Sequence, residues 1–187
     1  MARTEAPLPQ RIVIVGTTGA GKSHLARRIG ARLGYPIVEL DELHWLPGWR
    51  KRPEREFHDA VTRATEGPAW IVVGNYRATW PLTWPRAELV VWLDGGFLPL
   101  FSRLLRRSFR RAWTGAVVCN GNVETWRHLV GRDSILVWFI RTFAANRRRY
   151  GAILRDPGPW RGPRFVRLRS DREVEALLDG LTRRSAA

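Results

Sequence analysis

The sequence predicts an α/β fold in which a five-stranded parallel sheet lies between two layers of helices. Three observations support this fold class. Short apolar segments alternate with segments of helical periodicity along the 187 residues, and this alternation is typical of parallel strands joined by helical crossovers. A glycine-rich turn separates the first strand segment from the first helix segment. Polar residues follow the predicted strands, at the edge where parallel sheets bind ligands.

Five short apolar segments bounded by turn residues are predicted to form the strands. They are residues 11–15, 37–40, 69–73, 88–93 and 165–168. Five longer segments have apolar residues at helical spacing and are predicted to form helices. They are residues 23–33, 54–66, 97–113, a segment from a cap at Asp133 or Ser134 to about Tyr150, and a last helix that begins at the capping box Ser170-x-x-Glu173.

The remaining segments are predicted to be loops and tails around a single domain. Proline-broken loops are expected at residues 81–85 and 156–163, and a longer loop or lid at residues 115–131. Residues 11–183 are expected to form the domain, with a disordered tail at 1–10 and a short tail at 184–187.

The glycine-rich turn matches the phosphate-loop pattern G-x-x-x-x-G-K-[ST] in the context of strand, turn and helix that this pattern requires. It reads Gly16-Thr17-Thr18-Gly19-Ala20-Gly21-Lys22-Ser23-His24. Glycines allow the backbone N–H groups to wrap closely around phosphate oxygens at the positive end of the next helix. Lys22 is expected to reach the β- and γ-phosphates, and Ser23 to bind Mg²⁺. A connector without a ligand is the weaker alternative, since all fixed positions match.

Polar residues at the other strand ends should meet this loop in one cleft. Asp41 ends the second strand, Asn75 follows the third, and Asp94 ends the fourth. Asp41 is a candidate to accept a hydrogen bond from an acceptor hydroxyl or to hold Mg²⁺ through water; the alternative is a carboxylate that caps the turn. Asn75 is a candidate acceptor-binding residue.

Two arginines on the helix at 97–113 are candidates for catalysis. Arg103 and Arg107 are one turn apart, so both are expected to project into the cleft, where phosphoryl transfer needs positive charge. The alternative is a solvated charged face. Arg141 interrupts an apolar helical stretch and is expected to find an anionic partner or to lie in the cleft.

Ten tryptophans are present, and several are expected to pack in the core. Trp45 and Trp49 are candidates to stack on a planar acceptor, and packing under the turn between them is an equal alternative.

Composition narrows the classes of ligand and compartment. The formal net charge is +15, and 30 of the 32 basic residues are arginines because only two lysines are present. This charge favours anionic ligands: nucleotides, nucleic acid or a membrane surface. Cys119 is the one cysteine, which excludes an internal disulfide and suits the cytoplasm. The start has no signal-peptide pattern, and no apolar run reaches about 18 residues, so no membrane span is expected. A membrane is not expected among the partners.

Three stretches together resemble the adenylate-kinase-related P-loop proteins known as the DNA topology modulation, FlaR-related family. They are the phosphate loop, the run Leu40-Asp41-Glu42-Leu43-His44-Trp45-Leu46-Pro47-Gly48-Trp49 with Val73-Gly74-Asn75-Tyr76, and residues 119–126 followed by 132–136. The likeness covers roughly residues 11–150. It implies a three-layer P-loop NTPase similar to nucleoside and nucleotide kinases, with a small acceptor-binding insertion at 42–67 and a lid at 114–132. It also implies that Arg77 holds a phosphate of the acceptor and that Arg103 and Arg107 begin the lid.

One position departs from the family pattern. The family usually has Asp before the Gly-Asn-Tyr run, where it holds a Mg²⁺-bound water, and this chain has Val73. Either Asp41 or Asp94 takes over that role, or the protein transfers phosphate slowly, or it only binds nucleotide.

The favoured interpretation is a small-molecule kinase that uses ATP and Mg²⁺ with a nucleoside, nucleotide or other small acceptor. A second is a nucleotide-dependent regulator that binds nucleic acid, suggested by the charge although no nucleic-acid-binding motif is recognisable. A third is a nucleotide-binding protein with weakened catalysis. No pattern indicates a particular oligomeric state.

Overall fold

A computed structural model describes residues 7–131 and 134–185, and it confirms the predicted α/β fold. Five strands form a parallel sheet in the order β2-β5-β1-β6-β9. They are β1 (Arg11–Gly16), β2 (Ile37–Glu39), β5 (Trp70–Val73), β6 (Leu89–Leu93) and β9 (Arg164–Leu168). β1 lies at the centre, so the loop that follows it emerges in the middle of the carboxyl edge.

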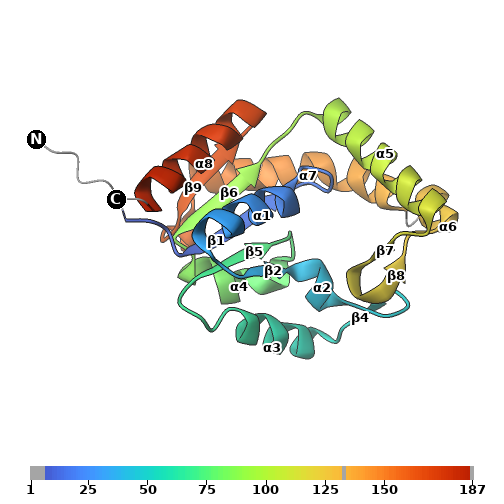
Figure 1. Cartoon of the computed structure of the whole chain (residues 1–187), viewed down its shortest axis with the longest axis horizontal. Helices are drawn as coiled ribbons and strands as arrows, with labels where there is room; N and C mark the ends of the chain where they lie inside the picture. Colours follow the sequence, from blue (N-terminus) through green and yellow to red (C-terminus); the bar gives the residue numbers. More distant parts are fainter. Residues whose placement is uncertain (1–6, 132–133, 186–187) are drawn as a thin grey trace, which may run out of the picture.

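Helices cover both faces of the sheet (Figure 1). They are α1 (Lys22–Leu33), α2 (Leu40–His44), α3 (Glu54–Ala64), α4 (Trp80–Thr83), α5 (Phe97–Thr114), α6 (Trp126–Val130), α7 (Ile135–Arg155) and α8 (Asp171–Ser185). Two short hairpins stand outside the sheet. They are β3 (Trp45–Leu46) with β4 (Arg50–Lys51), and β7 (Val117–Val118) with β8 (Asn122–Val123).

Side-chain alternation along β1 builds a separate core on each face of the sheet. Val13 and Val15 belong to a core that also contains residues of α3, α4 and α7. Ile12 and Ile14 belong to a second core that includes α1 and α8. A third cluster, in which Leu104 of α5 takes part, joins α5 to α7 away from the sheet. This cluster positions α5 beyond the carboxyl edge.

The proline-broken loop expected at 81–85 is instead helical. Residues 77–86 form η1 (Arg77–Thr79), α4 and η2 (Trp84–Arg86). Pro81 and Pro85 occupy the first turns of α4 and η2, where a helix needs no N–H donor. The rings of Trp80 and Trp84 stack at 4.2 Å in the core, and this buried pair stabilises the segment.

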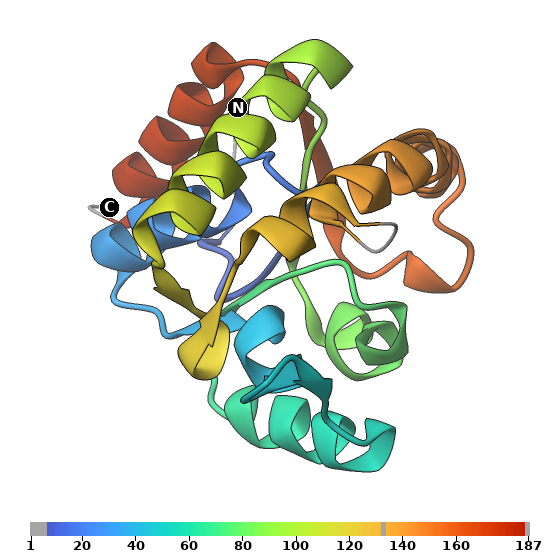
Figure 2. The same cartoon turned by 90° about the vertical axis from the view of Figure 1, so that its right-hand side faces the viewer.

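Two other segments are more structured than expected. Leu40, assigned to a strand, begins α2. The lid-like segment at 115–131 contains the β7–β8 hairpin and α6 rather than an open loop. Figure 2 shows that hairpin beside the segment from α2 to β4.

Helix ends and tails also differ from the expected bounds. α7 continues to Arg155, and α8 continues to residue 185, beyond the expected domain end. Asp133 lies outside the described residues, whereas the Ser134 hydroxyl caps α7 by accepting from the N–H of Val137 at 3.2 Å. Leu8 packs on the second core and the Gln10 N–H donates to Glu88 at 2.8 Å, so residues 7–10 join the domain. Residues 1–6 and 186–187 of the expected tails are outside the described part.

Within the described residues, no helix is both long and apolar enough to cross a bilayer.

Candidate nucleotide and acceptor site

The loop between β1 and α1 is shaped by three glycines. Gly16, Gly19 and Gly21 have φ values of 148°, 84° and 90°, which side chains with a Cβ rarely adopt. At Gly16 an added Cβ would lie 2.6 Å from the carbonyl oxygen of Leu93. Only glycine fits there, and the loop turns tightly into α1.

The N-terminus of α1 is open to an anion. Its N-cap, Gly21, offers no side-chain hydrogen bond, and its first turn has no acidic residue. The first N–H groups of a helix have no partner within the helix, and the helix dipole adds positive potential there. A nucleotide phosphate fits this end of the helix. Of the other predicted loop residues, Thr17 is buried, Thr18 and Ala20 are half-buried, and His24 is exposed.

Lys22 lies folded over its own loop. Its Nζ donates to the carbonyl oxygens of Gly16 at 2.9 Å and Thr17 at 3.3 Å. Burial lowers the pKa of Lys22 to about 8; Asp41 opposes this shift and Arg107 adds to it. A bound phosphate would stabilise the ammonium form, because an opposite charge at contact favours ionisation.

Ser23 contacts a carboxylate that the sequence analysis did not single out. Its hydroxyl donates to Glu39 Oε2 at 3.0 Å. Burial raises the pKa of Glu39, and the hydrogen bond from Ser23 acts against this rise. The sequence analysis treated Glu39 as an ordinary strand residue. An acidic side chain in the last position of an otherwise apolar strand is the pattern that could have indicated its role. Ser23 and Glu39 fit a Mg²⁺ ion, which binds one or two protein oxygens together with nucleotide phosphates.

Asp41 lies in the first turn of α2, just beyond the carboxyl end of β2. Its Oδ1 accepts a hydrogen bond from the Tyr76 hydroxyl at 2.6 Å. Burial and the Asp41 carboxylate raise the pKa of Tyr76, so the phenol stays a donor. Asp41 is exposed and is therefore accessible to a substrate hydroxyl. Its charge also acts on Lys22.

The two predicted catalytic arginines have different surroundings. Arg107 is half-buried, its Nε has no partner among the described residues, and burial lowers its pKa. Its charge acts on Lys22. Arg103 is 53% exposed, and its Nη2 lies 3.9 Å from Asp171 at the start of α8. The structure therefore does not support the expectation that Arg103 projects into the cleft, because its guanidinium lies beside Asp171 of α8.

Asn75 binds the loop itself. Its Oδ1 accepts from the Gly16 N–H at 3.1 Å and from the Tyr150 hydroxyl at 3.1 Å, and its Nδ2 donates to the Gly16 carbonyl at 2.6 Å. The side chain predicted to bind an acceptor thus holds the first glycine of the loop.

Asp94 is not free to hold a metal-bound water. Its side chain is 1% exposed, and Arg147 Nε lies 2.9 Å from one carboxylate oxygen while Arg167 donates to the other. This pairing corrects the expectation that Asp94 replaces the missing Asp. Arg141 is exposed and has no ion pair among the described residues, so the expected anionic partner of Arg141 is absent there.

A cavity of about 240 Å³ lies beside Asn75. Its lining combines two arginines, two amides, a hydroxyl and an aromatic wall. These residues are Asn75, Arg77, Trp138, Thr142, Ala145, Asn146 and Arg149. Neither arginine forms an ion pair with a described carboxylate, so the cavity is suited to an anionic ligand.

Trp45 and Trp49 do not line this cavity. Their rings meet edge to face at 5.6 Å. The Trp49 backbone N–H donates to Asn122 Oδ1 at 2.7 Å, and its indole N–H donates to the Val123 carbonyl at 3.2 Å. The packing alternative therefore describes Trp49.

Among the described residues, no group of three His, Cys, Asp or Glu side chains forms a preassembled metal centre. A cation here would depend on Ser23, Glu39 and the oxygens of a bound nucleotide.

Comparison with models of protein families gives no match, and comparison with curated proteins gives none either. The structure is similar to a gluconokinase from Sinorhizobium meliloti 1021, with a TM-score of 0.54 and 21% identity over 95% of this chain and 94% of that one. It is also similar to a shikimate kinase from Bacteroides thetaiotaomicron, with a TM-score of 0.53 and 16% identity over 96% of this chain and 99% of that one. The chain therefore shares its α/β fold with these two kinases.

Proposed function

We propose that this chain is an ATP- and Mg²⁺-dependent kinase for a small anionic acceptor. The observation that carries the proposal is the glycine-shaped loop that opens onto an uncapped helix, with Lys22 folded over it and Ser23 bonded to Glu39. The kinase neighbours support the reaction class through the fold they share.

Bound Mg²⁺ would neutralise phosphate charge and orient the β- and γ-phosphates. Ser23 is the residue proposed to bind it, and Glu39 the residue proposed to hold one of its waters. Lys22 and Arg107 would supply positive charge around the transferring group. Both are partly desolvated by burial, so their fields are less screened than those of exposed arginines.

Asp41 is proposed to accept the proton of the attacking hydroxyl. Tyr76 donates to one of its oxygens, which orients the carboxylate and leaves the other oxygen for the substrate. A carboxylate with fixed orientation suits positioning of a nucleophile.

The acceptor is proposed to carry a carboxylate or phosphate that binds in the cavity lined by Arg77 and Arg149. Planar guanidinium groups recognise both anions by paired hydrogen bonds. Asn75 lines this cavity and also holds Gly16, which supports a location next to the phosphate loop.

The test is ADP release, measured with a coupled assay over matched pairs of acceptors that differ only in a carboxylate or phosphate. Acceptor-dependent turnover that requires the anionic group supports the proposal. ATP binding without turnover on any anionic polyol, nucleoside monophosphate or sugar acid would contradict it.

Membership of the DNA topology modulation, FlaR-related family belongs to the same proposal. What supports it is the run of residues 40–49 together with Gly74-Asn75-Tyr76. Weakened catalysis is the alternative that follows from Val73. Substitution of Val73 by Asp distinguishes a weakened site from a fully active kinase.

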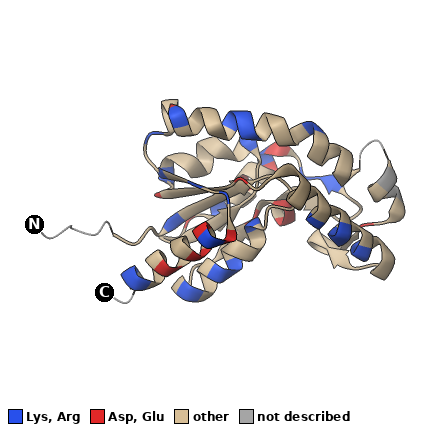
Figure 3. Cartoon of the chain, turned by 90° about the horizontal axis from the view of Figure 1, so that it is seen from above, with Lys and Arg blue, Asp and Glu red and all other residues tan. Residues whose placement is uncertain are grey.

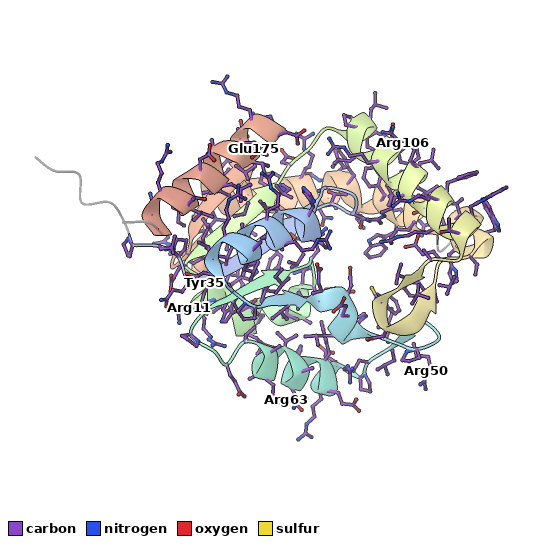
Figure 4. The ribbon with its side chains drawn as sticks, viewed as in Figure 1. Arg11, Tyr35, Arg50, Arg63, Arg106 and Glu175 are labelled. Carbon is purple, nitrogen blue, oxygen red and sulfur yellow. The ribbon has the colours of Figure 1, made fainter. Side chains whose placement is uncertain are left out.

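A second candidate function, binding of single-stranded nucleic acid, is favoured by the outer side of α5. Phe109, Trp113 and Trp126 are 50%, 75% and 43% exposed and contact one another at ring distances of 5.2–6.5 Å. Exposed arginines lie along the same helix, which has no acidic residue (Figure 3). Figure 4 shows Arg106 on the outer side of α5. Exposed rings with adjacent arginines suit base stacking and phosphate contacts.

Fluorescence anisotropy with a labelled single-stranded oligonucleotide at two salt concentrations tests this second function. Specific contacts predict that Trp113→Ala weakens binding about tenfold, and that affinity falls steeply as salt rises. Equal affinity of Trp113→Ala and wild type would show that binding depends on non-specific charge and not on base stacking by Trp113.

A further inference from the structure

Two hairpins that are about 70 residues apart in the chain are joined by side-chain amides. We call β3–β4 with its turn, residues 45–51, the acceptor hairpin, and β7–β8 with its turn, residues 117–123, the lid hairpin. The Asn120 Nδ2 donates to the carbonyl oxygens of Glu42 at 2.6 Å and Trp45 at 2.7 Å. Figures 1 and 2 show the two hairpins side by side.

Asn122 makes the second half of this connection. It is 3% exposed, its Oδ1 accepts from the Trp49 N–H at 2.7 Å, and its Nδ2 donates to the Leu46 carbonyl at 3.1 Å and to the Cys119 carbonyl at 2.7 Å. Each of these three hydrogen bonds joins the amide either to its own hairpin turn or to the acceptor hairpin. No residue type other than Asn offers this combination at this length.

The backbone at the junction supports a specific connection rather than a loose contact. Trp49 and Asn120 are the non-glycine residues with positive φ, at 57° and 51°, in the described chain. For a bulky residue such as Trp49 this conformation is strained. The bonds from its N–H to Asn122 and from its indole to Val123 hold it there.

The connection joins the two sides of the candidate site. The acceptor hairpin directly follows α2, which carries Asp41. Two residues separate the lid hairpin from the end of α5, which carries Arg107, and Arg111 of α5 pairs with Glu124 next to the hairpin at 2.7 Å. Any movement of one hairpin without the other breaks the amide bonds between them.

We propose that Asn120 and Asn122 are positioning residues that make the two hairpins a single gate, so that Asp41 and Arg107 approach or leave the phosphate loop together. This inference rests on the proposed kinase function, because that function gives the gate its role. The coupled opening of the two hairpins can be measured without turnover.

The one cysteine of the chain gives a direct readout of this gate. Cys119 is half-buried in the turn of the lid hairpin, directly before Asn120, and its carbonyl accepts from Asn122. Burial raises the pKa of its thiol. Because the sequence has no other cysteine, the rate of modification by iodoacetamide reports how often this turn opens.

The experiment compares the labelling rate of Cys119 in wild type, Asn122→Ala, Asn120→Ala and the matched control Thr125→Ala. Loss of the hydrogen bonds between the hairpins predicts faster labelling in both asparagine variants, by about tenfold in Asn122→Ala, whose bonds are partly buried, and by less in Asn120→Ala, whose bonds are exposed. Thr125→Ala should label at the wild-type rate, since the Thr125 hydroxyl contacts His128 within its own segment. Wild-type labelling rates in both asparagine variants, with unchanged circular dichroism, would overturn the proposal.

Hydrogen exchange provides a second measurement, and its comparison of the two hairpins in the wild-type protein does not depend on how any variant folds. A single gate predicts equal protection for the amides of residues 45–51 and 117–123, and a joint rise in exchange of both in Asn120→Ala. Exchange of one hairpin without the other would overturn the coupling. Neither experiment uses ATP, so failure of the kinase proposal would leave both results interpretable.

Turnover gives a third readout once an acceptor is identified. The positioning role predicts that Asn122→Ala raises the KM for the acceptor and lowers kcat while the affinity for an ATP analogue stays unchanged. A loss of nucleotide affinity with normal acceptor kinetics would contradict it.

Discussion

Glu39 and Val73 are paired neighbours on β2 and β5, and the Glu39 carboxylate accepts a hydrogen bond from the Ser23 hydroxyl at 3.0 Å. Register partners on adjacent parallel strands carry their side chains on the same face. The carboxylate that the family resemblance leads one to expect at position 73 is therefore supplied from the neighbouring strand at the same level of the sheet. Val73 does not by itself imply a defective site.

The first prediction separates Glu39 from Val73. Glu39→Gln keeps the size of the side chain and removes its charge, so kcat/KM should fall about 10- to 100-fold, with a higher Mg²⁺ requirement. Val73→Asp alone should give little gain, and in the Glu39→Gln background it should restore part of the lost activity. Steady-state ADP release over a Mg²⁺ titration measures both. A large gain from Val73→Asp in the wild-type background would favour weakened catalysis instead.

The second prediction concerns pH. Lys22 has a pKa of about 8 without nucleotide, so its ammonium is charged at neutral pH and becomes neutral as pH rises. Phosphate groups with a second pKa of about 6 are mostly ionised from pH 7 upward, so the fall in affinity at higher pH follows Lys22. Affinity for an ATP analogue should therefore be level between pH 7 and 7.5 and fall by up to about tenfold per unit well above pH 8. Fluorescence titrations from pH 7 to 9.5 measure it, and constant affinity to pH 9.5 would be inconsistent with this role of Lys22.

The third prediction distinguishes the two arginines of α5. Arg107 is desolvated and acts on Lys22, so Arg107→Gln should lower kcat about 100-fold or more. Arg103 is exposed and faces α8, so Arg103→Gln should change kcat by about twofold or less. Single-turnover phosphoryl transfer for the two variants gives the comparison, and equal losses would show that both reach the transferring group.

The fourth prediction addresses Asn75. Asn75→Ala removes three hydrogen bonds, two of them to Gly16, and should lower the free energy of unfolding by about 1–3 kcal/mol. It should also weaken ATP-analogue binding about tenfold, because the loop loses its support. Tyr150→Phe, which removes only the bond from the Tyr150 hydroxyl to Asn75, is the matched milder variant. Full nucleotide affinity in Asn75→Ala would contradict a role of Asn75 in supporting the phosphate loop and would leave only a role in acceptor binding.

Most of the fold was predictable because local patterns and tertiary structure agree. The three central strands are buried, all five strands are bounded by turn residues, and the phosphate loop combines a fixed spacing with glycines in backbone conformations that other residues rarely adopt. Where the two disagreed, packing decided. Residues 77–86 contain two prolines typical of loops, yet Trp80 and Trp84 bury their rings and the prolines fit helix first turns.

The candidate site was predictable only where spacing along the chain defines it. Lys22 and Ser23 follow from one motif, whereas the contact between Ser23 and Glu39 joins residues on two elements. The direction of Arg103 depends on the placement of α5 against α7, which helical periodicity does not determine. Asn120 and Asn122 read as turn residues in the sequence, and their partners are about 75 residues away.

Isothermal titration calorimetry with a non-hydrolysable ATP analogue and Mg²⁺ tests the phosphate-binding loop most directly, with wild type and Lys22→Ala side by side. The expected result is one site per chain in wild type and a loss of affinity of about 100-fold in Lys22→Ala. Absence of binding by the folded wild-type protein, or the same affinity in both proteins, would contradict nucleotide binding at this loop.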